Sequence, residues 1–111
     1  MRLEAHRLNG IITACAETLG PTVWTSGEVA LYLHGSRADD SKRGGDIDLL
    51  LVGSHALLDT LKQKRRALLV AMEKHIGECR IDLLIAPQQS EEQSDFVKTI
   101  LAGAVILHPA G

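Results

Sequence analysis

Three aspartates are the residues of this chain whose types and spacing could do chemistry. Asp46 and Asp48 stand two residues apart at the start of an apolar run, and Asp82 lies within a later apolar run over residues 80–85. Unpaired carboxylates are costly to bury, so three of them in apolar segments indicate a shared use. This arrangement is the one expected where a phosphate group is held against divalent cations.

Asp46 and Asp48 leave the same face of an extended strand, because side chains alternate between the two faces. Two carboxylates this close repel each other unless a cation lies between them. Mg²⁺ suits such a sparse site, since it takes one or two carboxylates together with phosphate oxygens and water. If the strand that carries Asp82 neighbours the first one, Asp82 completes a site for two Mg²⁺ ions. Asp82 would then also draw the proton from an attacking hydroxyl.

Gly35, Ser36 and Arg37 follow a short apolar run and precede a polar loop over residues 38–45. A glycine lets the backbone approach a phosphate closely. The Ser36 hydroxyl and the amides that follow it can donate hydrogen bonds to phosphate oxygens, more so where a helix begins. Arg37 offers either a charge-assisted contact to phosphate or an ion pair with Asp39, Asp40 or Glu28. This turn is therefore predicted to bind a triphosphate.

The elements that must position these residues alternate between helix and strand. Apolar residues at helical spacing predict a helix over residues 3–19, ended by a Gly-Pro pair. A connection over residues 22–28 leads to a strand over residues 29–34, where apolar side chains alternate. The nearly continuous apolar run over residues 46–52 predicts a second strand that is buried on both faces.

The second half of the chain repeats this alternation. We expect a helix over residues 54–76, a third strand over residues 79–86, a short helix ending near Gly103, and a last strand or extended tail over residues 104–108. This order predicts an α/β fold with a mixed β-sheet and flanking helices. A length of 111 residues is that of one domain, so residues 1–111 are expected to form a single domain.

Composition narrows the classes of partner. The formal net charge of −2 leaves no basic footprint for direct nucleic-acid binding. Cys15 and Cys79 lie among apolar residues with neither disulfide nor metal-site spacing, which favours free thiols and a cytoplasmic location. No apolar signal core opens the chain and no apolar run could span a bilayer, so a membrane partner is not expected.

Three segments together resemble the motifs of the minimal nucleotidyltransferase (MNT) family, within the DNA polymerase β-like nucleotidyltransferase superfamily. They are residues 33–38 (Leu-His-Gly-Ser-Arg-Ala), 45–50 (Gly-Asp-Ile-Asp-Leu-Leu) and 80–83 (Arg-Ile-Asp-Leu). The resemblance extends over nearly the whole chain and implies the minimal polymerase-β-like fold. The chain departs from the family at His34, where an aromatic residue is usual, and at Gly45, where serine is frequent. The segment between the two motifs is also slightly shorter than usual.

The resemblance implies Mg²⁺-dependent nucleotidyl transfer with ATP as the substrate. Proteins of the MNT family are often encoded beside a HEPN-domain protein, an all-helical ribonuclease toxin, and several act as antitoxins that transfer AMP to a tyrosine of that toxin. By similarity, Ser36 would contact phosphate beside Gly35 and Arg37. Asp46 and Asp48 would hold Mg²⁺, and Asp82 would assist the nucleophile.

Two other hypotheses stay open. In one, the chain is a non-catalytic antitoxin that neutralises its partner by masking it. In the other, it transfers a nucleotide to a small molecule such as an aminoglycoside. The chain has no additional helical module for an acceptor, so we expect the acceptor to come from another chain. A homodimer and a hetero-oligomer with a HEPN partner are both compatible with the sequence, and base recognition has no visible motif.

Overall fold

Four strands form one mixed sheet in the order β3-β2-β1-β4. The computed structural model describes residues 3–38 and 45–109. The strands are β1 (Val29–His34), β2 (Ile47–Gly53), β3 (Ile81–Pro87) and β4 (Val105–His108). Strand β1 pairs antiparallel with β2 and with β4, and β2 pairs parallel with β3. The α/β fold class with a mixed sheet is therefore confirmed, and the last segment is a strand of the sheet.

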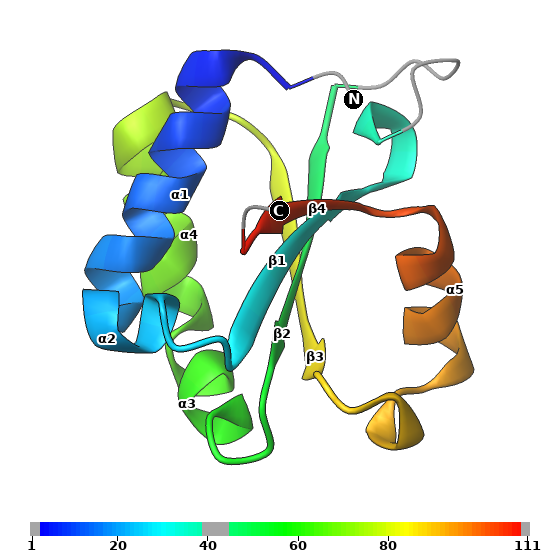
Figure 1. Cartoon of the computed structure of the whole chain (residues 1–111). Coiled ribbons are helices and arrows are strands. Elements are labelled where there is room, and N and C mark those ends of the chain that lie inside the picture. The colour runs from blue at the N-terminus through cyan, green and yellow to red at the C-terminus, as the bar shows by residue number, and fades with distance from the viewer. Residues whose placement is uncertain (1–2, 39–44, 110–111) are drawn as a thin grey trace.

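Helices cover both faces of the sheet (Figure 1). On one side lie α1 (Ala5–Leu19), α2 (Pro21–Trp24), α3 (Leu58–Gln63) and α4 (Arg65–Ile76), and on the other lies α5 (Asp95–Gly103). Two short 3₁₀ turns, η1 (Gly35–Arg37) and η2 (Ser90–Glu92), follow β1 and β3. Within the described ranges, no helix is long and apolar enough to cross a membrane.

The alternation of side chains along the strands divides the core into two clusters. Leu31, Leu33 and Leu49 face α1 and α4 in the larger cluster. Ala30, Leu50, Val52 and Ala86 face the other way, with α5 packed against them through Val97, Ile100 and Leu101. Strand β2 contributes to both clusters, because it lies between two other strands and helices cover both of its faces. Its near-continuous apolar run is the pattern of such a strand.

The helix predicted over residues 54–76 is wrong as a single element. The helical segment begins at Leu58, and it is divided into α3 and α4 at Lys64, whose backbone (φ −91°, ψ 1°) leaves the helical region. The side chains at the division explain it: Lys64 Nζ donates to the Thr18 carbonyl (3.1 Å) and Arg65 Nε donates to the Leu83 carbonyl (2.8 Å). These contacts join α4 to α1 and to β3, so tertiary contacts override the helical periodicity.

The connection predicted over residues 22–28 is also only partly right, since α2 opens it. Pro21 stands in the first turn of α2, where its missing N–H costs nothing. Trp24 ends this helix, is 4% exposed, and stacks on His108 with ring centroids 3.6 Å apart. The His108 ring also contacts the Trp24 carbonyl through Nε2 at 2.6 Å. Aromatic packing against β4 thus stabilises a helical turn that the local sequence does not signal.

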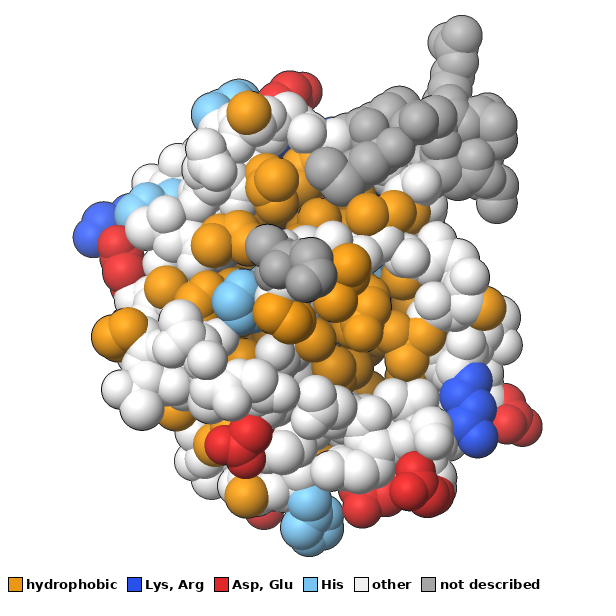
Figure 2. Space-filling view, in the orientation of Figure 1, with side chains coloured by type: hydrophobic (Ala, Val, Ile, Leu, Met, Phe, Trp, Pro, Cys, Tyr) orange, Lys and Arg blue, Asp and Glu red, His pale blue; other side chains and the backbone are white. Residues whose placement is uncertain are grey.

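Hydrophobic side chains gather on the surface over the β4 edge of the sheet, between α2 and α5 (Figure 2). Ile106 of β4 is 47% exposed. Charged side chains lie around the rim of this surface. The three aspartates of the sequence analysis lie elsewhere, on the strands β2 and β3 and the segment that leads into β2.

Candidate active site

Three polar side chains form a row across adjacent strands. Residue His34 of β1 pairs with Asp48 of β2, and Asp48 pairs with Asp82 of β3. Paired residues of neighbouring strands share a face, so the three side chains lie side by side. The next row on this face is apolar and packs against α5 through Tyr32, Leu50 and Leu84. The sheet therefore changes from an apolar, helix-covered face to a polar end at this row.

The strand of Asp82 neighbours the strand of Asp48, which meets the condition for Asp82 to join the other carboxylates. The two strands are parallel and their aspartates are in register. Strand β3 is an edge strand, and Asp82 is exposed at its start. The structure thus places two of the three predicted carboxylates on one face of two paired strands.

Asp46 lies just before β2, which begins one residue later than predicted. Its side chain is 51% exposed, and Oδ2 lies 3.7 Å from Nε of Arg80. Arg80 also accepts a backbone hydrogen bond from Ile47 through its carbonyl, at 2.9 Å. Asp46 is therefore close to Asp48 along the chain, but its side chain is turned to Arg80, in the segment that leads into β3.

Gly35 brings the predicted phosphate-binding turn against Asp48. Its φ of 71° lies in the left-handed region that favours glycine. A Cβ at this position would lie 2.3 Å from Oδ2 of Asp48, so the carboxylate occupies the space that a side chain would fill. Turn η1 and the acidic row are thus in direct contact. The positive φ favours glycine here, and a side chain at this position would also displace the Asp48 carboxylate.

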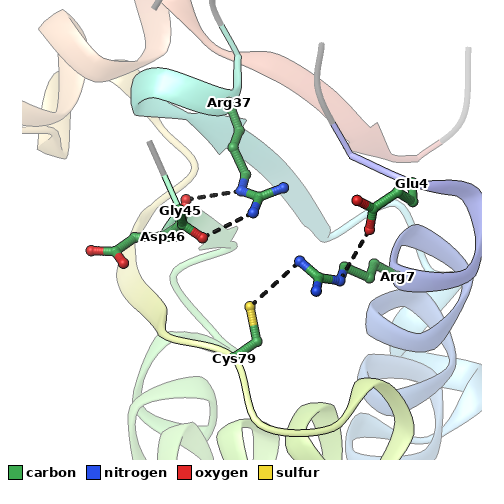
Figure 3. A network of polar contacts seen from close by, with 6 residues as sticks. All are labelled: Glu4, Arg7, Arg37, Gly45, Asp46 and Cys79. Atoms are coloured by element: carbon green, nitrogen blue, oxygen red, sulfur yellow. Dashed lines mark hydrogen bonds and ion pairs between the residues drawn. The ribbon is translucent and has the colours of Figure 1, made fainter. Parts of the chain in front are cut away.

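Arg37 bonds to the backbone that leads into β2, and two of the carboxylates expected as its ion-pair partners, Asp39 and Asp40, lie outside the described residues. Its Nε donates to the carbonyl of Asp46 (3.1 Å) and its Nη2 donates to the carbonyl of Gly45 (2.9 Å). Figure 3 shows the Asp46 carboxylate directed away from this guanidinium. These bonds tie η1 to the segment that enters β2. The backbone of Ser36 lies in η1, whereas its side chain is outside the described part of the chain.

A second arginine joins α1 to the segment that enters β3 (Figure 3). Arg7 Nε lies 3.1 Å from Oε2 of Glu4, and Nη1 donates to the sulfur of Cys79 at 3.8 Å. Cys79 directly precedes Arg80, whose side chain pairs with Asp46. This contact links the segment that leads into β3 to the helical layer.

Among residues 3–38 and 45–109, no three His, Cys, Asp or Glu side chains already converge as a metal site. The chemistry of the donors nevertheless fits Mg²⁺, because Asp48 and Asp82 offer carboxylate oxygens on one face. The Asp46–Arg80 pair is long and solvent-exposed, and such pairs contribute only about 0–1 kcal/mol. Turning the Asp46 carboxylate toward a cation would therefore cost little.

The Asp46–Arg80 pair is the feature of this site that sequence reasoning missed. A signal for it was present: Arg80 stands two residues before Asp82, as Asp46 does before Asp48. In parallel strands with Asp48 and Asp82 in register, these two positions lie side by side. The pattern becomes informative only once the register is known.

No family model matches this chain, and no curated protein matches it. The case for a function therefore depends on the residues named above and on their arrangement.

Proposed function

We propose that this protein is a Mg²⁺-dependent nucleotidyltransferase that transfers AMP from ATP to a tyrosine hydroxyl of a HEPN-domain toxin and so acts as its antitoxin. The observation that carries the proposal is the contact between Gly35 and Asp48, with Asp82 in register beside Asp48. It brings a turn suited to phosphate and two carboxylates suited to a hard cation to one end of one sheet face.

Each residue of the site has a role in this proposal. The backbone of η1 would approach the triphosphate at Gly35, and Ser36 would donate hydrogen bonds to it. Arg37 would keep the turn beside the segment that leads into β2, through its bonds to the carbonyls of Gly45 and Asp46. Asp46, Asp48 and Asp82 would hold Mg²⁺, which when bound offsets the negative charge of the phosphates.

The reaction is a displacement at the α-phosphorus of ATP. The acceptor oxygen forms a bond to this phosphorus, the bond to the bridging oxygen of the β-phosphate breaks, and pyrophosphate leaves. Asp82, exposed at the edge strand, would accept the proton that the acceptor hydroxyl loses. A neutral tyrosine hydroxyl is a poor nucleophile without such a base.

Intact-mass spectrometry tests this function. The chain is co-expressed with the HEPN-domain protein encoded beside it, as wild type and with Asp48→Asn. We expect an AMP-sized mass increment on the HEPN protein with wild type, and a rate at least about 100-fold lower with Asp48→Asn because the cation loses a ligand. Asp59→Asn is the matched control, since Asp59 is exposed on α3.

Three outcomes would contradict the proposal. Equal transfer by wild type and Asp48→Asn would remove the site from the reaction. A stable complex that protects the cells without any mass increment would favour neutralisation by masking. AMP transfer to a small molecule in the absence of any partner chain would instead support the third hypothesis.

A further inference from the structure

His34 carries a polar atom that the proposed function does not yet use. Its Nε2 is shielded from solvent and has no hydrogen-bond partner among the described residues. Buried polar side-chain atoms are nearly always paired, so such an atom calls for a partner in some state of the protein. The ring belongs to the last residue of β1, immediately before Gly35.

Because this atom is shielded from a diffusing ligand in this state, the described residues beside it are the candidates for its partner. The register places Asp48 directly opposite His34 on the same face. Side chains that face each other across antiparallel strands have Cβ atoms about 4.5–5.5 Å apart, so rotation of either side chain can close a hydrogen bond. Asp82 lies one strand further away, and Tyr32 belongs to the apolar row.

In the structure, the Asp48 carboxylate points toward Gly35, and it can rotate from there toward His34. Its Oδ2 occupies the space over Gly35, one residue from His34, where the missing Cβ admits it. A carboxylate that turned from this space toward a cation would need a donor to hold its new orientation. In metal sites the carboxylate ligands are themselves hydrogen-bonded, and the partners that hold them are part of the site.

We propose that His34 is a positioning residue for Asp48: its Nε2–H donates a hydrogen bond to one oxygen of the Asp48 carboxylate and leaves the other oxygen to face the cation. This inference rests on the proposed function, since it assigns a role to the same site. The imidazole contacts neither the nucleotide nor the acceptor, and it acts only through Asp48.

Two variants of similar length separate the hydrogen bond from the packing of the ring. In His34→Gln an amide nitrogen replaces Nε2, whereas His34→Met fills comparable space without a donor. Binding of Mg²⁺ with α,β-methylene-ATP is measured by calorimetry, and thermal melting verifies that each variant folds. We expect about 10–100-fold weaker binding for His34→Met and binding close to wild type for His34→Gln. His55→Gln is the control, as the His55 side chain is 83% exposed.

Nitrogen-15 NMR of the wild-type ring gives a second readout that needs no folded Met variant. In the presence of Mg²⁺ and the analogue, we expect the tautomer that carries the proton on Nε2, and a shift of this nitrogen in Asp48→Asn. A ring protonated on Nδ1 alone would overturn the assignment.

The outcomes separate the two proposals. If His34→Met binds like wild type while Asp48→Asn loses binding, the role of His34 is wrong and the site stands. If wild type does not bind the probe, or Asp48→Asn binds it equally well, the proposed site fails and the role of His34 fails with it.

Discussion

Gly35 has φ of 71°, and a Cβ on it would lie 2.3 Å from Oδ2 of Asp48. Gly77 has a similar φ of 81°, yet apart from its chain neighbours no atom of the described residues lies within 4 Å of its Cβ position. The two glycines therefore both need a positive φ, but only Gly35 has a neighbouring side chain where its Cβ would lie. This difference allows the backbone strain and the displacement of Asp48 to be measured separately.

We expect Gly35→Ala and Gly77→Ala each to lower the free energy of unfolding by about 1–3 kcal/mol, because each forces an alanine into the left-handed region. Only Gly35→Ala also fills the space beside the turn that the triphosphate is proposed to approach, so it alone should lose binding of Mg²⁺ with α,β-methylene-ATP. Urea denaturation and calorimetry check the two effects. Equal binding by the two variants would show that a close approach at Gly35 has no part in binding.

At the scale of elements, the close packing of α1 on α4 holds the helical layer together. A Cβ on Gly10 of α1 would lie 2.4 Å from Cγ2 of Ile76 and 3.3 Å from Cβ of His75, both in α4. The missing side chain at Gly10 thus lets the two helices approach. Helix α4 in turn is joined to β3 by the hydrogen bond from Arg65 to the Leu83 carbonyl.

Gly10→Val should destabilise the protein by about 1–3 kcal/mol, because the added side chain must separate α1 from α4. Asn9→Val is the matched control: it introduces the same side chain at the neighbouring exposed position of α1. Urea denaturation of both variants gives the comparison. A Gly10→Val protein no less stable than Asn9→Val would mean that the helices do not pack as closely as described.

The bounds of the helices and strands show which features of secondary structure the local sequence predicts. The bounds of β1 were predicted correctly, because strict alternation is a property of the strand itself. The predicted helix over residues 54–76 was wrong because the division at Lys64 depends on Thr18 and Leu83, both far away in the sequence. Helix α2 was missed for the same reason, since its Trp24 is held by His108.

At the scale of the whole molecule, one titratable group lies deep between the layers. Cys15 of α1 is buried in the larger apolar cluster, and desolvation raises the pKa of its thiol from 9.0 to about 12. In the unfolded chain the thiol ionises near 9.0, so between these values the unfolded state binds fewer protons than the folded state. Stability contributed by this group is therefore fully present below pH 9 and falls as the pH rises toward 12.

We accordingly expect the free energy of unfolding to fall more steeply between pH 8 and pH 10 for wild type than for Cys15→Ala. Other groups titrate in this range in both proteins, so the difference between the two slopes isolates Cys15. Urea denaturation at several pH values measures both slopes. Parallel slopes would mean that Cys15 is accessible to solvent in the folded protein.

The sequence by itself determined which residues could bind a cation and a phosphate, and which segments are strands, because residue type and periodicity are local properties. The tertiary structure alone decided that β3 lies beside β2, that Asp82 is in register with Asp48, and that Arg37 bonds to the carbonyls of Gly45 and Asp46. Strand order and register follow from burial of both sheet faces beneath helices, which couples residues distant in the chain. For that reason the candidate carboxylates were named from the sequence, and their arrangement was not.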